Sequence, residues 1–548
     1  MESEFNLVYE PWIKVRWGDE VSEVSLLDAL VNAHRYTALA GEMPTQDIAM
    51  LRLLLAVLHA ALQNMEVEYE QEDDIHLNKW EELWRARKFP KNIVTDYLKK
   101  WKSRFYLFDE KYPFYQVADI KEFTELTAAK LNGALSESAN KLRLFPQISG
   151  ENKKNLSYSE AARWLITFNA WDDIMTCKNA VYHNKESYDK GRKYGWLGTL
   201  GNIYVVGKNL FETLMLNLAF DSYDVKEFPV WEIEKPLSCS TREGKMYGIK
   251  VPDNQATLLT LLGRYMLLVK DDETKQVTSV KVAKKLLVSQ NDLFVEKMTV
   301  WGQNKNNEFY PKKHDPSVQA WREFGSIVTK ADDADHKPGI REWLGNFIGN
   351  GQPLYRKIIS FSICGVEYDS KGGSIVNSFS DSLTLHSSLL SEFGKQWDLK
   401  IEDEIAACDN VANYLHTLQK ELILSKSAVP DKLDNINKQS DKIKQEFYFM
   451  IDIPFRKWLE SIDPNDEKIT ISEKCSELRD TVAKIARQYA KELADSAGQS
   501  AIVGRYGKNI FGKTKAEKEM ERHYSSPEAL NRFYGKLNNL YLKGGNNK

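Results

Sequence analysis

The chain begins with the run Phe5-Asn6-Leu7-Val8-Tyr9-Glu10-Pro11-Trp12-Ile13-Lys14-Val15, and the Leu-rich segment Pro44–Leu62 follows after a polar connection. The first run alternates apolar and polar residues, which is typical of a half-buried strand. Gly18-Asp19 separates it from a second apolar–polar run, so we predict a hairpin. The Leu-rich segment is apolar on most faces. It therefore predicts a buried helix from about 46 to 64, with Thr45 as its N-cap.

The length of the chain, 548 residues, exceeds what one hydrophobic core usually serves, so we expect at least two domains. Strand-like runs and helices mix up to about residue 385, and beyond it the pattern is almost wholly helical. The sequence predicts an α+β protein, with a mixed α/β domain over 1–385 and a C-terminal four-helix bundle over 386–548. The expected bundle helices lie near 388–424, 430–460, 469–497 and 526–542.

Composition narrows the class of protein. The formal net charge is −3, so a nucleic-acid site would have to be a local patch. Five scattered cysteines without a C-x-x-C pair favour reduced intracellular thiols and argue against structural zinc. Glu2 and Glu4 stand where a signal peptide would be basic, and the apolar run Leu53–Leu62 is too short to span a bilayer. We expect a cytoplasmic protein without membrane, metal or cofactor.

One catalytic motif matches by its letters. Gly507-Lys508-Asn509-Ile510-Phe511-Gly512-Lys513-Thr514 fits the P-loop pattern, in which the lysine would contact phosphates and the threonine would hold Mg²⁺. A P-loop needs a buried parallel strand before it, whereas this run lies in a helical region. A basic connection between helices is the favoured interpretation, and a P-loop ATPase stays as the alternative. No other pattern indicates a reaction, so we expect no enzyme.

Three basic segments with little helical pattern remain, near 140–154, 176–195 and 297–313. Loops this long in a compact domain are usually functional or disordered. Lysine and arginine on such loops suit phosphate contacts, although solvated surface is the simpler interpretation of any one of them.

The chain resembles the CasA family, the large subunit of the type I-E CRISPR surveillance complex, Cascade. The resemblance runs in patches whose order and spacing agree along most of the chain. They are Phe5–Val15, Ser25–Leu30, Pro44–Leu62, Phe105–Gln116, Asn140–Phe145, Ala161–Leu165, Gly195–Gly201 and Asn209–Leu214.

The resemblance implies a non-catalytic subunit that recognises a short protospacer-adjacent motif (PAM) in double-stranded DNA and promotes opening of the duplex for a guide RNA. The implied partners are the guide RNA, the target duplex, the backbone, small and 5′-end subunits, and a helicase-nuclease recruited in trans. The C-terminal bundle, with nine Lys/Arg against four Glu over 505–543, would contact DNA and subunits. A purely structural scaffold is a further alternative.

The resemblance also implies site residues. A loop at about 131–146 would hold the end of the guide RNA, through Asn140, Lys141, Arg143 and Phe145. Three elements would approach the PAM from the minor groove: a lysine at Lys297, a loop with Lys190, Gly191, Arg192 and Lys193, and a hairpin tip with Lys371, Gly372 and Gly373. The loop is poorer in glycine than in the family, and the tip lacks the glutamine wedge of some relatives. Since the minor groove distinguishes mainly A·T from G·C, this implies a tolerant PAM preference.

Overall fold

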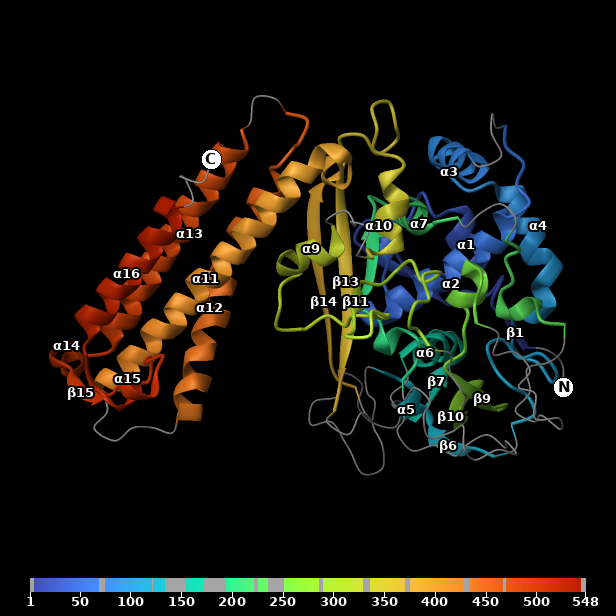
Figure 1. Cartoon of the computed structure of the whole chain (residues 1–548). Helices are drawn as coiled ribbons and strands as arrows, with labels where there is room; N and C mark the ends of the chain where they lie inside the picture. Colours follow the sequence, from blue (N-terminus) through green and yellow to red (C-terminus); the bar gives the residue numbers. More distant parts are fainter. Residues whose placement is uncertain are drawn as a thin grey trace. The chain divides into compact units, whose positions relative to one another are not determined.

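The computed structural model describes residues 4–68, 74–120, 122–133, 154–171, 194–220, 225–234, 251–284, 289–328, 336–369, 375–426, 433–466 and 470–543. The chain forms two compact units. Unit 1 comprises residues 1–316, 330–355 and 359–382, and unit 2 comprises 317–329, 356–358 and 383–548. Figure 1 colours the chain from blue, in unit 1, to red, in unit 2. The mixture of small sheets and helices confirms the predicted α+β class.

Unit 1 carries several small sheets rather than one large one. Their strand orders are β1-β5, β3-β2-β4, β6-β10-β7 with β9 also on β10, β11-β12, and β14-β13-β8. The strands are β1 Glu4–Asn6, β2 Ile13–Trp17, β3 Glu20–Val24, β4 Ala38–Leu39, β5 Tyr106–Phe108, β6 Thr124–Thr127, β7 Leu156–Ser157, β8 Asn202–Val206, β9 Arg264–Asp271, β10 Gln276–Lys284, β11 Trp301–Gln303, β12 Phe309–Pro311, β13 Ile358–Tyr368 and β14 Ile375–His386. The chain passes from unit 1 into unit 2 within β14.

The predicted hairpin at the start of the chain is confirmed. Strands β2 and β3 pair antiparallel, from Ile13 opposite Val24 to Trp17 opposite Glu20. Gly18 stands in the two-residue turn with a φ of +60°, a conformation that glycine adopts without steric cost. Trp12, just before β2, is fully buried, so this hairpin is tied to the core of unit 1.

The Leu-rich segment forms α2, Pro44–Leu62, which packs against α4, α6, α7 and α8. Its N-cap is Met43, and Thr45 lies buried in the first turn, so the predicted Thr45 cap is wrong. Proline fits the first helical position because its missing N–H would have no partner there. The helix is long and apolar enough to cross a membrane by composition alone, but 94% of its most apolar window is buried in the protein. It is a core helix.

The remaining helices of unit 1 pack on α2, on the sheets or on one another (Figure 1). A capping box begins α6: Ser157 Oγ accepts from Glu160 N, and Glu160 Oε2 accepts from Ser157 N. The helices are α1 Leu26–Val31, α3 Ile75–Ala86, α4 Lys91–Trp101, α5 Ala128–Leu131, α6 Tyr158–Trp171, α7 Leu210–Asn217, α8 Gln255–Leu259 and α10 Gly339–Gly345.

Unit 2 contains the predicted bundle, made of α11 Lys395–Lys426, α12 Leu433–Glu460, α13 Ile471–Ser496 and α16 Ser526–Lys543. Helix α11 contacts the other three, and α13 contacts both α12 and α16 (Figure 1). Smaller elements join them: α9 Phe324–Ile327, α14 Gln499–Val503, β15 Arg505–Lys508, α15 Lys515–Glu519 and β16 Glu521–Tyr524. The buried Glu421 of α11 accepts from Arg522 and Arg532, which ties β16 and α16 to the bundle.

Candidate nucleic-acid interface

Of the residues predicted to contact nucleic acid, the structure describes Lys297. The others lie outside the described residues: Asn140, Lys141, Arg143, Phe145, Lys190, Gly191, Arg192, Lys193, Lys371, Gly372 and Gly373. The chain on either side of these segments is described, however. The geometry of the candidate interface is therefore the geometry of Lys297 and of the points where the three segments begin and end.

Lys297 follows a fully buried carboxylate. Glu296 accepts both terminal nitrogens of Arg52 on α2, at 3.0 and 2.8 Å, the indole N–H of Trp196 at 2.6 Å and the backbone N–H of Met298 at 3.0 Å. Burial raises the pKa of Glu296, but Arg52 and the other donors outweigh it and hold the pKa below its usual range. The carboxylate is thus ionised and fully hydrogen-bonded, and it fixes the backbone next to Lys297.

The lysine itself is half-buried between β8 and α10. Ile340 N donates to Lys297 O at 2.9 Å, and Ile203 N donates to Met298 O at 3.1 Å. A Cβ added at Gly339 would stand 2.5 Å from Cδ of Lys297, so this glycine leaves the room that the lysine side chain occupies. The aliphatic stem is therefore placed by packing, which limits the directions open to the ammonium group.

The backbone carbonyl of Trp171 joins the ends of two predicted contact segments. Trp171 O accepts from Gly195 N at 3.1 Å, so the described chain just before 172–193 meets the described chain just after it. It also accepts from Tyr368 Oη at 2.5 Å, two residues before the hairpin tip at 370–373.

The rings of Tyr194 and Tyr368 stack with centroids 3.8 Å apart, and Lys313 Nζ lies 4.9 and 5.1 Å from them. We call Trp171, Tyr194, Lys313 and Tyr368 the root cluster. Lys297 is connected to the root cluster indirectly. Trp196, two residues after Tyr194, donates to Glu296, the residue just before Lys297. The described residues at the ends of both PAM segments and the residue before Lys297 are thus linked within one region of unit 1.

An apolar pocket extends from Trp171 of the root cluster to Gly133, at the start of the segment expected to hold the guide RNA. It is lined by Gly133, the last residue described before 134–153, together with Trp164 and Trp171 of α6 and Ile375 at the start of β14. A Cβ at Gly133 would stand 2.7 Å from the ring of Trp164, so the chain passes closely over that tryptophan. The segment expected to hold the guide RNA therefore begins beside the other two.

The arrangement offers lysines and aromatic rings on a rigid base, which suits phosphate and sugar contacts. Within the described residues no group of three His, Cys, Asp or Glu side chains could hold a metal ion. Sequence reasoning missed Trp171, Tyr194 and Tyr368. A usable signal was present, because an aromatic residue stands just before or just after each of the two PAM segments.

The P-loop alternative does not fit the geometry of residues 507–514. Gly507 and Lys508 belong to β15, which pairs antiparallel with β16, and no parallel strand precedes the loop within the described part of unit 2. Thr514 Oγ1 caps α15 by accepting from Glu517 N, and Glu517 Oε2 accepts from Lys513 N at 2.6 Å and Thr514 N at 3.2 Å. The protein's own carboxylate occupies the backbone donors that a phosphate would use. The run is also a hairpin with a short helix, not the plain connection predicted.

The basic stretch 505–543 is less available for DNA than its charge suggests. Arg505 donates to Leu424 O, and Arg522 and Arg532 bind Glu421. These three arginines hold the bundle together. A DNA contact from this stretch would fall to its exposed lysines, such as Lys508, Lys513, Lys515 and Lys518.

The fold defines an α+β protein with a C-terminal helical bundle. A sequence model of the family described as CRISPR-associated protein Cse1 matches residues 6–493. The chain therefore belongs to the Cse1 family, also called CasA, as the sequence resemblance predicted. A CasA/Cse1 protein of Thermus thermophilus is 34% identical over 241 residues, which is 44% of this chain and 44% of that relative. The alignment thus spans less than half of the relative's length.

Solved structures agree with this fold over nearly the whole chain. Thermobifida fusca Cse1 is 24% identical with a TM-score of 0.79, and the match covers 98% of both chains. Cse1 from Acidimicrobium ferrooxidans is 22% identical with a TM-score of 0.74, covering 98% of this chain and 99% of the other. A chain of a CRISPR RNA-guided surveillance complex is 15% identical with a TM-score of 0.68, covering 97% and 99%.

Proposed function

We propose that this protein is the non-catalytic large subunit of a CRISPR RNA-guided surveillance complex and that it recognises the PAM in double-stranded DNA. The observation that carries the proposal is the convergence of Lys297 and the ends of both PAM segments on the root cluster. Family membership and the fold shared with a chain of such a complex support the assignment to the complex.

In this proposal, Lys297, the segment with Lys190, Gly191, Arg192 and Lys193, and the tip with Lys371, Gly372 and Gly373 probe the duplex from the minor groove. The loop near 131–146 holds the end of the guide RNA. The protein thereby promotes local opening of the duplex so that the guide RNA can pair with the target, and it then helps to recruit a helicase-nuclease. Sequence specificity comes from pairing, whereas the protein reads only a short motif. We expect the complex to act in the cytoplasm.

The test is binding of the assembled complex to a duplex library randomised beside the target. Omitting this subunit should abolish the preference for particular flanks. Lys297→Ala should weaken binding to the preferred flank about tenfold and binding to the other flanks much less, because a contact in the groove of the preferred motif is lost. Lys99→Ala, an exposed lysine on α4, is the matched control and should leave binding to every flank unchanged.

Two outcomes would refute parts of this proposal. If the complex binds every flank equally with and without the subunit, the protein is a scaffold. If the flank preference persists in Lys297→Ala at full strength, the subunit senses the PAM through other residues and the assignment of the lysine is wrong.

A further inference from the structure

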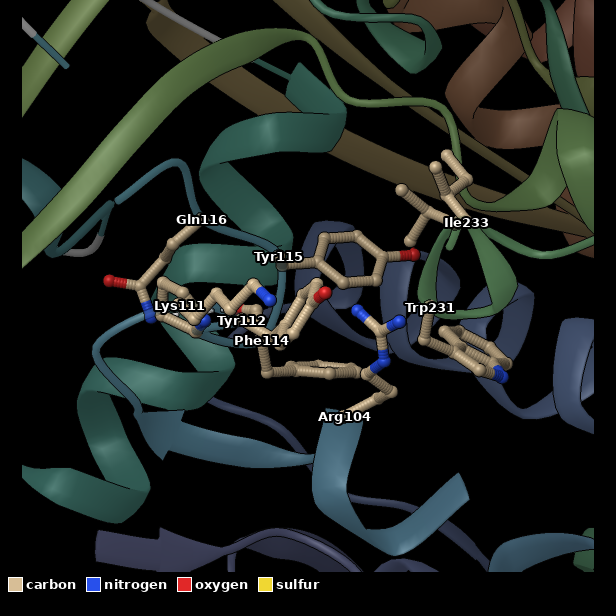
Figure 2. A pocket seen from close by; sticks show the side chains of 10 residues that line it. Arg104, Lys111, Tyr112, Phe114, Tyr115, Gln116, Trp231 and Ile233 are labelled. Carbon is tan, nitrogen blue, oxygen red and sulfur yellow. Dashed lines mark hydrogen bonds between the residues drawn. The ribbon is translucent and has the colours of Figure 1, made fainter. Parts of the chain in front are cut away.

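The described part of unit 1 has a small pocket beside β5, apart from the proposed contact residues. Figure 2 shows Arg104, Tyr115 and Trp231 around it. The pocket encloses about 30 Å³, which is room for about one or two water molecules. It is therefore too small for a ligand group. An exposed apolar surface on unit 2, in contrast, is open to a large partner.

That surface is on helix α12, on the side that faces solvent. Phe449 is 81% exposed, Ile453, one turn further along, is 62% exposed, and Met450 beside them is 37% exposed. Single apolar residues are common on protein surfaces, but neighbouring ones that are this exposed indicate a contact with another molecule. The core of unit 2 does not need them, because Ile451 and Phe455, on the opposite side of the helix, are the residues that are buried.

The exposed side of α12 has the spacing of a coiled-coil seam. Steps of four and three residues in alternation keep side chains on one narrow stripe of a helix. On α12 such steps join six residues, which we call the α12 stripe: Lys442, Glu446, Phe449, Ile453, Arg456 and Glu460. The stripe thus has an apolar centre with charged residues on both sides of it.

The order of these charges makes α12 complementary to itself. When two copies of the helix lie antiparallel about a two-fold axis at Ile451, Phe449 faces Ile453 of the second copy. In the same register Lys442 faces Glu460 of the second copy, and the symmetry makes each contact twice. A parallel pair would instead place like charges against each other. Opposite charges therefore favour the antiparallel pair in this one register.

The outer charges are available for such contacts. Lys442 and Glu460 are exposed, and within the described part of the chain neither has an ion-pair partner. The inner contact, between Glu446 and Arg456 of the second copy, also joins opposite charges, although each of these residues already has a hydrogen-bond partner in unit 2. The outer contacts should therefore contribute most to the choice of register.

Other occupants fit the α12 stripe less well. It carries two cations and two carboxylates, so it gives no positive field for the phosphates of a nucleic acid. An unrelated helix would have to match the order of apolar and charged residues from its own sequence, whereas a second copy matches it by symmetry. We propose that a second copy of this protein covers the α12 stripe, with the two α12 helices antiparallel.

The contact is expected to be weak. A single pair of helices buries less than the roughly 1,200 Å² of surface that stable complexes bury. We expect a dissociation constant on the order of 100 µM, so the pair forms in the free protein only at high concentration.

The first test follows the association of the full chain by sedimentation velocity from about 5 to about 500 µM, a range over which a weak dimer shifts the average mass. The wild type should pass from monomer toward dimer. Phe449→Ser removes the apolar centre from both copies and should raise the dissociation constant at least about tenfold. Leu399→Ser is the matched control, since Leu399 on α11 is 65% exposed and lies outside the stripe, and it should leave association unchanged.

The second test examines the register. Lys442→Glu sets two carboxylates against each other in each outer contact and should weaken association about fivefold, and Glu460→Lys should do the same with two cations. The double variant with both substitutions exchanges the charges and should restore association to within about twofold of the wild type. Lys484→Glu, at an exposed lysine on α13, changes the net charge as Lys442→Glu does and is the control that should have no effect.

Three results would overturn the proposal. The first is a wild type that stays monomeric over the whole range, and the second is association that Phe449→Ser leaves intact. The third is a double variant that associates no better than its parents, which would exclude the antiparallel register. If the free chain is monomeric and Phe449→Ser fails to enter the assembled complex, the stripe binds another subunit instead. The thermal unfolding midpoint of each variant checks its folding. None of these measurements involves the PAM, so their failure leaves the proposed function untouched.

Discussion

Lys297 and Lys513 differ in how well the local sequence motif predicts a binding role. Lys513 in unit 2 sits in a motif whose letters match a P-loop, whereas Lys297 in unit 1 sits in no recognisable motif at all. In the structure, Lys297 is the better placed of the two lysines to contact a phosphate. Around Lys513 the backbone donors are occupied by Glu517, and around Lys297 a buried ion pair and a close glycine fix the position of the side chain.

The difference teaches that a binding site depends on which donors remain unused as well as on residue types and spacing. A capping carboxylate on its own loop satisfies the groups that would have bound phosphate, at no entropic cost of bringing in a ligand. A lysine whose neighbours are fixed loses less freedom when it contacts a phosphate. Substitutions at these contacts test whether Lys297 and Lys513 differ in this way.

The largest expected effect comes from removing the carboxylate beside Lys297. Glu296→Ala leaves Arg52 buried without its partner and also strips the indole N–H of Trp196 of its acceptor. Breaking a buried pair from one side typically costs about 3–5 kcal/mol. Unit 1 should therefore unfold at a clearly lower temperature and urea concentration.

Glu66→Ala, four residues after the end of α2, is the matched control, since this glutamate is exposed. It should change the free energy of unfolding by less than about 0.5 kcal/mol. Equal melting of both variants and the wild type would mean that the ion pair does not fix the segment, and the contrast with Lys513 would lose its basis.

The next largest effect is expected at Asp47, which is also on α2. Unlike Glu296, its buried carboxylate has no arginine or lysine partner to offset the cost of burial within the described residues. Within the described residues no lysine or arginine lies at ion-pair distance from Asp47, and its Oδ1 accepts from Gly41 N at 2.7 Å. Burial raises the pKa of Asp47 to about 6. Asp47→Asn keeps the acceptor and removes the charge.

The sign of the pH dependence follows from that raised pKa. The folded protein favours the protonated carboxyl, so the wild type should lose stability as the pH rises from about 4 to 6. Asp47→Asn should not show this loss and should be more stable than the wild type at pH 7.5 by about 1–3 kcal/mol. At pH 4 the two should be alike. Thermal unfolding across this range is the measurement, with the exposed Asp19→Asn as control; a constant difference at all pH values would contradict the prediction.

Local signals in the sequence predicted much of the fold. The Gly18-Asp19 turn and the long bundle helices are set by neighbouring residues, and the structure contains them. Thr45 was misplaced as a cap because Pro44 also suits a helix start.

The candidate site depends on contacts that no local pattern reveals. Arg52 and Glu296 are 244 residues apart in the chain, and Tyr368 meets the carbonyl of Trp171 from 197 residues away. Each partner alone is an ordinary polar or aromatic residue. Only the resemblance to a family pointed to Lys297, and only the fold shows what holds it.

The smallest expected effect is at Lys513, where the question is whether residues 507–514 bind a nucleotide. Lys513→Ala removes an exposed side chain from a loop whose backbone donors bind Glu517, so it should change the stability of unit 2 by less than about 0.5 kcal/mol. A true P-loop that binds ATP at a hundredth of the added concentration would be stabilised by about 2.7 kcal/mol. We expect no shift in the unfolding temperature with Mg·ATP, either in the wild type or in Lys513→Ala, with Lys515→Ala as the matched control. A nucleotide-dependent shift that only Lys513→Ala abolishes would mean that Glu517 yields its place to a phosphate. Residues 507–514 would then be a nucleotide-binding loop, as their sequence pattern indicates.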